Sequence, residues 1–231
     1  MRTRGAGLLA AALLSPAPVA AKPKPLAITP ASPDAAVILR VPRVDILYNI
    51  GIRSYDPAER RLAPGPTGPA WVNVIIRPGE PRDAFVVNKV KPGTYVFTDV
   101  IQQTRWATCF HKASYQFSIK PGQVLYLGEF DGVSALREVQ RQAVARGHLS
   151  VSSYTFHNYF DDVPPPPLTP GDERSLAGAR SFIAAEHPRT TSPVNRAQLS
   201  PAIFGTGRNP IGTKRMCSGW RSKKAEVPTA D

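Results

Sequence analysis

Cys109 and His111 are the residue types that could form a catalytic thiol and its base. In a thiol enzyme of the cell wall, a histidine accepts the cysteine proton and the thiolate attacks a carbonyl carbon. On a β-strand, however, residues two apart share one face and compete for the same space, and a catalytic histidine usually comes from another segment. The surrounding sequence contains no feature that clearly activates the thiol. A disulfide or a buried core position is the competing role for Cys109.

The only other cysteine of the chain is Cys217. An oxidising compartment would allow the two residues to form a disulfide. In the chain-entropy model, closing a loop of about 100 residues stabilises a protein by roughly 4 to 5 kcal/mol. The bond would attach the C-terminal segment to the rest of the domain. We expect this pair, with two free thiols as the alternative, because a sequence does not show that two Cβ atoms meet.

The remaining residues that could do chemistry form weaker patterns. The histidines show no His-x-x-x-His or Glu-x-x-His spacing, so we expect neither a metal nor a cofactor; they are His111, His148, His157 and His187. Glu129 and Asp131 are two residues apart and could face one cleft as acid and base. Two exposed acids at the end of a strand are the alternative, and we expect no catalytic residues.

Residues 1–21 have the three parts of a secretory signal. Arg2 and Arg4 supply positive charge, residues 6–14 are apolar, and residues 19–21 read Val-Ala-Ala before the expected cleavage site. The apolar run is much shorter than the roughly 20 residues of a membrane span. We therefore expect a protein exported to the periplasm or outside the cell, with no transmembrane segment.

The chain is strongly basic, with 29 Lys and Arg against 17 Asp and Glu. Cleavage would remove only Arg2 and Arg4 from this count and leave an excess of +10. Because an exported protein does not meet nucleic acid, the expected partners are an anionic envelope polymer or a lipid surface. A protein partner is the alternative.

Part of this charge is concentrated near the C-terminus. The cationic and aromatic residues of this region are Arg208, Lys214, Arg215, Trp220, Arg221, Lys223 and Lys224. A basic segment with an aromatic side chain is typical of attachment to an anionic layer. A solvated tail that keeps the protein soluble is the alternative.

The β-pattern is clearest between residues 85 and 130, where two Lys-Pro-Gly turns separate runs of aromatic and β-branched residues. This arrangement is typical of an antiparallel meander. Residues 124–127 lack polar alternation and predict a central strand covered on both faces. Further strands are expected at 36–41, 45–52, 71–77, 106–110, 115–120 and 149–158. Short, unequal strands favour a β-sandwich over a barrel.

Two amphipathic segments interrupt the strands. Residues 134–146 have apolar side chains at helical spacing and end before Gly147, and residues 172–187 begin at Asp172, which we expect to cap the helix. The expected organisation is therefore a Pro-rich linker at 22–33, a β-sandwich domain at 34–188 and a basic tail at 189–231.

Two units resemble known sandwich proteins. Residues 91–95 read KPGTY and look like the strand entry of transthyretin-like and carboxypeptidase-regulatory-like domains. Residues 117–128 read FSIKPGQVLYLG and are similar to small exported bacterial proteins of unknown function, which carry F-x-V-x-P-G-x-x-Y-L-G after the first unit and a helix near the end. The resemblance covers roughly residues 85–188. The segment 134–146 and the long tail depart from it.

The shared motifs are turn sequences, in which Gly93 and Gly122 supply backbone angles that are unfavourable for other residues. The resemblance therefore implies a mainly β, antiparallel sandwich of the transthyretin or immunoglobulin type, and it implies no catalytic residues. We expect a non-catalytic exported protein that binds or braces an anionic envelope component. The alternatives are a cell-wall thiol enzyme using Cys109, and a subunit that adds the edge strand 71–76 to a secreted assembly.

Overall fold

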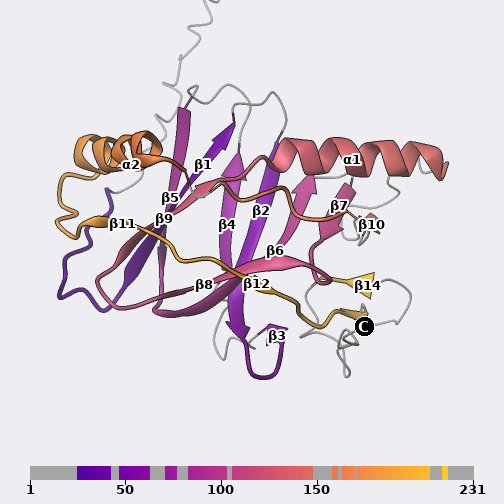
Figure 1. Cartoon of the computed structure of the whole chain (residues 1–231), viewed down its shortest axis with the longest axis horizontal. Helices are drawn as coiled ribbons and strands as arrows, with labels where there is room; N and C mark the ends of the chain where they lie inside the picture. The colour runs from indigo at the N-terminus through magenta and orange to yellow at the C-terminus, as the bar shows by residue number, and fades with distance from the viewer. Residues whose placement is uncertain are drawn as a thin grey trace, which may run out of the picture.

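The architecture is mainly β, with two helices at the periphery (Figure 1). The computed structural model describes residues 25–42, 47–62, 71–76, 83–102, 106–147, 158–160, 163–169, 171–208 and 215–217. Two sheets pack together, which confirms the sandwich-like β fold. The expected signal sequence at 1–21 lies outside the described residues, as does most of the strand expected at 149–158.

The first sheet has the strand order β11-β9-β1-β5. Its strands are β1 (Ala35–Pro42), β5 (Asp83–Val90), β9 (Val124–Glu129) and β11 (Val194–Arg196). Strand β9 lies between β1 and β11 and is buried along almost its whole length, as its unbroken apolar pattern predicted. It runs parallel to both neighbours, whereas β1 and β5 are antiparallel. The sheet is therefore mixed rather than purely antiparallel.

The second sheet is curled around a long central strand, β6 (Gly93–Gln102). Its order is β10-β7-β6-β2-β3, with β4 also paired to β2 and with β8 paired to β6 and β12. The bounds are β2 (Tyr48–Asp56), β3 (Arg61–Leu62), β4 (Trp71–Ile76), β7 (Trp106–Cys109), β8 (Ser114–Ile119), β10 (Asn158–Phe160) and β12 (Ser200–Ala202). In the described strands β4 pairs with β2 alone, so it is an edge strand, as the sequence predicted.

The core lies between the two sheets and follows the period-two pattern of β-strands. Inward-facing residues of β1, β2, β6, β8 and β9 form one buried cluster, and its largest members include Tyr48, Tyr95, Phe97, Phe117 and Phe130. The rings of Phe97 and Phe130 stack with centroids 5.3 Å apart. Burying each such side chain contributes about 1.5 to 3 kcal/mol, so this cluster is the main source of stability.

The outer face of the first sheet is covered by α2 (Glu173–Glu186), which explains why β1 is apolar without alternation. Leu176, Ala179 and Ile183 of this helix pack on Ile38 and Tyr126. Asp172 caps the helix as expected, since its carboxylate accepts a hydrogen bond from the Ser175 backbone N–H at 2.8 Å.

The other helix, α1 (Gly132–Ala145), begins two residues before the expected start. Asp131 caps it by accepting hydrogen bonds from the backbone N–H groups of Val133 and Ser134, both at 3.1 Å. Its apolar stripe, which includes Val139, packs beside Trp106 of β7. In Figure 1 this helix lies at the opposite end of the molecule from α2.

The expected linker at 22–33 is wrong for the residues from 25 onward. Leu26 and Ile28 pack against the α2 cluster, and Ile28 is fully buried. The Ile28 carbonyl accepts hydrogen bonds from the backbone N–H groups of Thr191 and Ser192. A Cβ on Gly122 would lie 2.4 Å from the Pro30 carbonyl oxygen, so this glycine permits the segment to lie close to the turn before β9. The prolines of this segment are typical of a linker, but its two apolar residues, Leu26 and Ile28, dock it on the domain.

The expected start of the tail at 189 is also too early. Strand β11 joins the first sheet, β12 joins the second, and Phe204 is fully buried. Each of these strands has three residues, and β12 includes Pro201, so no periodic pattern marks them in the sequence. The folded domain therefore extends at least to residue 208.

His187 links the leader segment to the end of α2 and gives a pH prediction. Its Nδ1 accepts a hydrogen bond from the Leu26 backbone N–H at 3.1 Å, which requires that atom to be unprotonated. Burial lowers the pKa of His187 in the folded protein, against a smaller raising effect of Glu186. As the pH falls, the unfolded chain therefore binds a proton at His187 before the folded protein does. The contribution of neutral His187 to the free energy of unfolding is complete above the unfolded pKa of about 6.5 and is lost as pH falls below it.

We expect the midpoint of thermal unfolding to fall more between pH 7.5 and pH 5 in the wild type than in His187→Gln. Differential scanning calorimetry of both proteins measures this difference, and the other histidines cancel in the comparison. An equal fall in the two proteins would show that His187 is not the titrating group.

Candidate functional site

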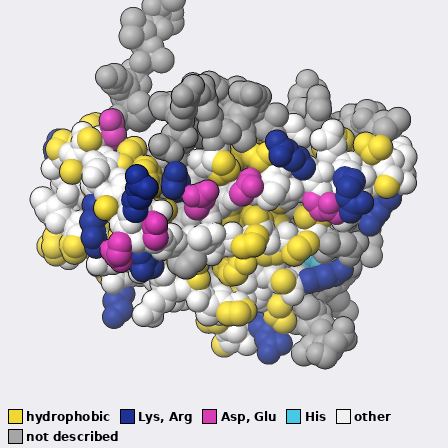
Figure 2. All heavy atoms as spheres, turned by 45° about the horizontal axis from the view of Figure 1, so that its top comes forward, with side chains coloured by type: hydrophobic (Ala, Val, Ile, Leu, Met, Phe, Trp, Pro, Cys, Tyr) yellow, Lys and Arg dark blue, Asp and Glu magenta, His cyan; other side chains and the backbone are white. Residues whose placement is uncertain are grey.

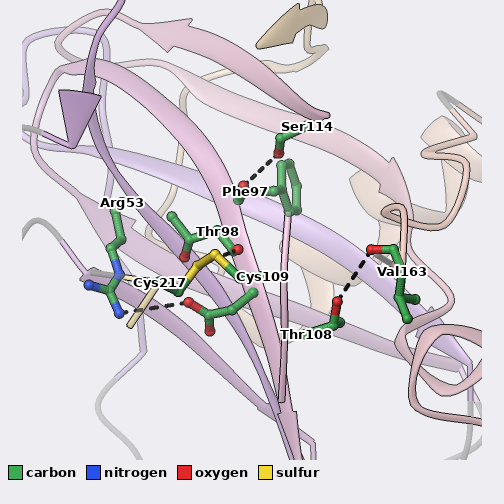
Figure 3. The surroundings of a disulfide bond; sticks show 9 residues. Arg53, Phe97, Thr98, Thr108, Cys109, Ser114, Val163 and Cys217 are labelled. Atoms are coloured by element: carbon green, nitrogen blue, oxygen red, sulfur yellow. Dashed lines mark hydrogen bonds and ion pairs between the residues drawn. A yellow bond between two sulfur atoms is a disulfide. The ribbon is translucent and has the colours of Figure 1, made fainter. Parts of the chain in front are cut away.

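Cys109 and Cys217 form a disulfide in the interior of the protein (Figure 3). Their Cα atoms are 5.4 Å apart, and the bond spans 108 residues of sequence. Both residues are almost fully buried, in a cluster with Val96, Ala202 and Phe204. The C-terminal segment is thus covalently attached to β7, near the end of the second sheet.

A buried polar layer lies beside the disulfide. Asp99 of β6 is opposite Cys109 in the strand register, and its carboxylate is 3.7 Å from the Arg53 guanidinium. Both charged side chains are buried. A Cβ on Gly51 would lie 2.5 Å from the Asp99 carboxylate, so only glycine fits there. The Cys217 sulfur lies 2.9 Å from the Thr98 carbonyl oxygen, which brings the disulfide into the same layer.

The disulfide directly follows a small pair of strands, β13 (Gly207–Arg208) and β14 (Arg215–Met216). We call these two strands the basic strand pair. Arg208 and Arg215 occupy directly opposed positions in its antiparallel register. Like charges at opposed positions disfavour strand pairing unless an acidic group or a bound anion compensates them. The structure therefore brings together two of the cationic residues expected to form a binding site.

The other members of that set, Lys214, Trp220, Arg221, Lys223 and Lys224, lie outside the described residues. The segment that precedes the basic strand pair is also held to the domain by hydrogen bonds. The Tyr55 hydroxyl donates to the Ile203 carbonyl at 2.7 Å, and the Gly205 N–H donates to the Arg60 carbonyl at 3.1 Å.

The residues weighed for catalysis have structural partners. Cys109 carries no thiol while it is disulfide-bonded, and the His111 carbonyl accepts from the Phe204 backbone N–H at 3.0 Å. Glu129 forms an ion pair with Arg40 at 3.3 Å, and Asp131 caps α1. Within the described ranges, no group of three His, Cys, Asp or Glu residues could hold a metal ion.

A cleft of about 420 Å³ beside α2 was not predicted from the sequence. It is lined by Arg40, Phe85, Asp172, Arg174, Ser175 and Gly178. Its residues come from β1, β5 and the first turns of α2, and only Asp172 carried a sequence signal, as a helix cap. Figure 2 shows positive and negative side chains intermixed on the left of the molecule, where α2 lies in Figure 1.

No helix in the described part of the chain is long and apolar enough to cross a membrane. Comparison with known proteins gives no relative. No family model, curated protein or solved structure matches this chain.

Proposed function

We propose that the protein is an exported, non-catalytic β-sandwich that binds an anionic component of the cell envelope through its basic C-terminal region. The observation that carries this proposal is the attachment of the basic strand pair to the sandwich by a buried disulfide. A flexible tail loses conformational freedom when it binds, whereas a segment held by a covalent bond has already lost part of it. Arg208 and Arg215, at opposed backbone positions of this pair, are the cations that would favour phosphate or carboxylate groups.

Three features support an extracytoplasmic location. Residues 1–21 have the pattern of a secretory signal. A structural disulfide is typical of an oxidising compartment. The resemblance to small exported bacterial proteins that we expect from the turn motifs of residues 85–188 would agree with both, although no family model matches the chain.

Co-sedimentation with vesicles that contain an anionic phospholipid tests the proposal. We expect Arg208→Gln/Arg215→Gln to bind about 10- to 30-fold more weakly at low salt, since each cation near an anionic surface contributes about 1 kcal/mol. Binding of the wild type should fade as salt shortens the Debye length from about 10 Å at 0.1 M. Purified wall polymer in place of vesicles separates a polymer partner from a lipid partner.

The matched control is Lys120→Gln/Arg137→Gln, which makes the same change in net charge at exposed positions far along the chain from the basic strand pair. This variant should bind like the wild type apart from a small general effect of charge. Equal weakening of the two double variants would mean that net charge alone drives binding. A truncation after Ser218, which retains Cys217, measures the contribution of residues 219–231.

The edge of β4 that has no partner among the described strands supports a second candidate, in which this strand pairs with a strand of a secreted assembly. The thiol-enzyme hypothesis gains no support from a cysteine that is buried and disulfide-bonded.

A further inference from the structure

The two edges of the first sheet are built differently. Strand β11 is three residues long, and its Asn195 and Arg196 are exposed. A short strand and an exposed charge both protect a sheet edge from pairing with another chain. Strand β5, at the other edge, is eight residues long, contains no proline and pairs with β1 without a register shift. In the part of the chain that the structure describes, no strand pairs with its outer side and no loop donates a backbone hydrogen bond to it.

The centre of β5 is apolar and only half-buried. Val86 packs on the core between the sheets, whereas Phe85 and Val87 pack on the cluster under α2. All three side chains nevertheless keep part of their surface exposed. Phe182 of α2 is also half-buried, and its ring centroid lies 5.5 Å from that of Phe85, so it continues this apolar surface. A long apolar edge strand is a template on which another strand can pair.

The sequence of β5 is complementary to itself. Its only charged residues are Asp83 and Lys89, which are six positions apart. When two copies of β5 pair antiparallel about Val86, position 83 of each copy is opposite Lys89 of the other, and Phe85 is opposite Val87. Directly opposed residues share one face of a sheet, and pairs of opposite charge or of apolar side chains contribute roughly 0.2 to 1 kcal/mol each. This register therefore joins opposite charges at both ends and apolar residues in the middle.

We propose that β5 is the interface of a symmetric dimer, in which it pairs antiparallel with β5 of a second copy of this chain. The first sheets then join into one continuous sheet with four strands from each copy. The two-fold axis passes beside Val86, so the contact is closed and pairing stops at two copies. Because the axis is perpendicular to the joined sheet, both α2 helices lie on the same face, and Phe182 of each copy extends the apolar contact. The proposal does not involve the basic strand pair and is independent of the proposed function.

Cross-linking of introduced cysteines tests the register. In Val86→Cys the two thiols lie opposite each other, with Cβ atoms about 4.5 to 5.5 Å apart. We expect a short bifunctional maleimide to convert most of this variant into a covalent dimer, since both native cysteines are in a buried disulfide and do not react. Lys89→Cys is the matched control at a more exposed position of the same strand. Its two thiols would be roughly 20 Å apart, so it should form little dimer.

Exchange of the two charges tests the partner. Sedimentation equilibrium of the mature protein should show a reversible dimer with a micromolar dissociation constant, as is usual for a small interface. Lys89→Glu should weaken the dimer about 10-fold, because it places two acidic residues opposite each other at both ends. Asp34 keeps its ion pair with Lys91 at 2.8 Å in this variant. Asp83→Lys/Lys89→Glu should restore the dimer, and only a second copy can provide this rescue, because the two positions are roughly 20 Å apart within one strand.

Three results would overturn the dimer. The first is a wild-type protein that stays monomeric at its highest soluble concentration. The second is a mass that grows beyond two copies, which would indicate open pairing of unlike edges. The third is cross-linking of Lys89→Cys as strong as that of Val86→Cys, which would indicate random collision. Arg208→Gln/Arg215→Gln should leave the mass of the dimer unchanged, so dimerisation and envelope binding can fail separately.

Discussion

Replacement of both cysteines, as Cys109→Ala/Cys217→Ala, should lower the free energy of unfolding by about 4 to 5 kcal/mol. The bond closes a loop with a sequence separation of 108 residues, and a loop of this length greatly restricts the unfolded chain. Urea denaturation followed by circular dichroism measures the change. The same shift should follow treatment of the wild type with reductant under denaturing conditions, because both remove one cross-link.

Loss of the disulfide should also weaken binding while the protein remains folded. The two sheets do not depend on Cys217, so the variant should keep its β-sheet spectrum while its affinity for anionic vesicles falls. A loss of stability below about 1 kcal/mol would mean that the unfolded chain is already compact, or that the C-terminal segment is held by its other contacts.

The second large effect is expected from the buried ion pair. Arg53→Met should destabilise the protein by about 3 to 5 kcal/mol, because it leaves the Asp99 carboxylate buried without its guanidinium. Methionine retains much of the apolar volume of the arginine stem, so a simple cavity is not the cause. Urea denaturation again provides the measurement.

The double variant Arg53→Met/Asp99→Leu tests the cause of this effect. Removing both charges should recover most of the lost stability, since a buried ion pair can be replaced by apolar residues at little cost. A double variant as unstable as Arg53→Met would show that the two residues act through separate contacts. Gly51→Ala should also destabilise, because its Cβ would lie 2.5 Å from the same carboxylate.

The strands and helices with strong local patterns could be predicted from the sequence. The alternation in β8, the apolar run of β9 and the cap at Asp172 each indicated the correct element. Gly93 and Gly122 have the positive φ angles expected of their turns, +151° and +69°. These features succeeded because the cause of each lies within a few residues.

The failures have a non-local cause. Strands β11 and β12 are three residues long and form only because longer strands are already in place beside them. The docking of Ile28 depends on α2, which is far away in the sequence. The cleft could not be predicted for the same reason, since Arg40 and Arg174 come to line one cleft only after the first sheet and α2 have packed together.

The parallel pairing of β9 affects how the chain reaches its folded state. Its two neighbours, β1 and β11, come from opposite ends of the described chain, so the first sheet is complete only after residue 196 has emerged. Contacts between such distant segments slow folding, because the long intervening loops must be ordered first. A chain of this kind would remain unfolded during synthesis for longer than one built from local hairpins. Under the proposed export, in which the chain would cross a membrane as an extended thread, slow folding would preserve translocation competence until the C-terminal strands arrive on the far side.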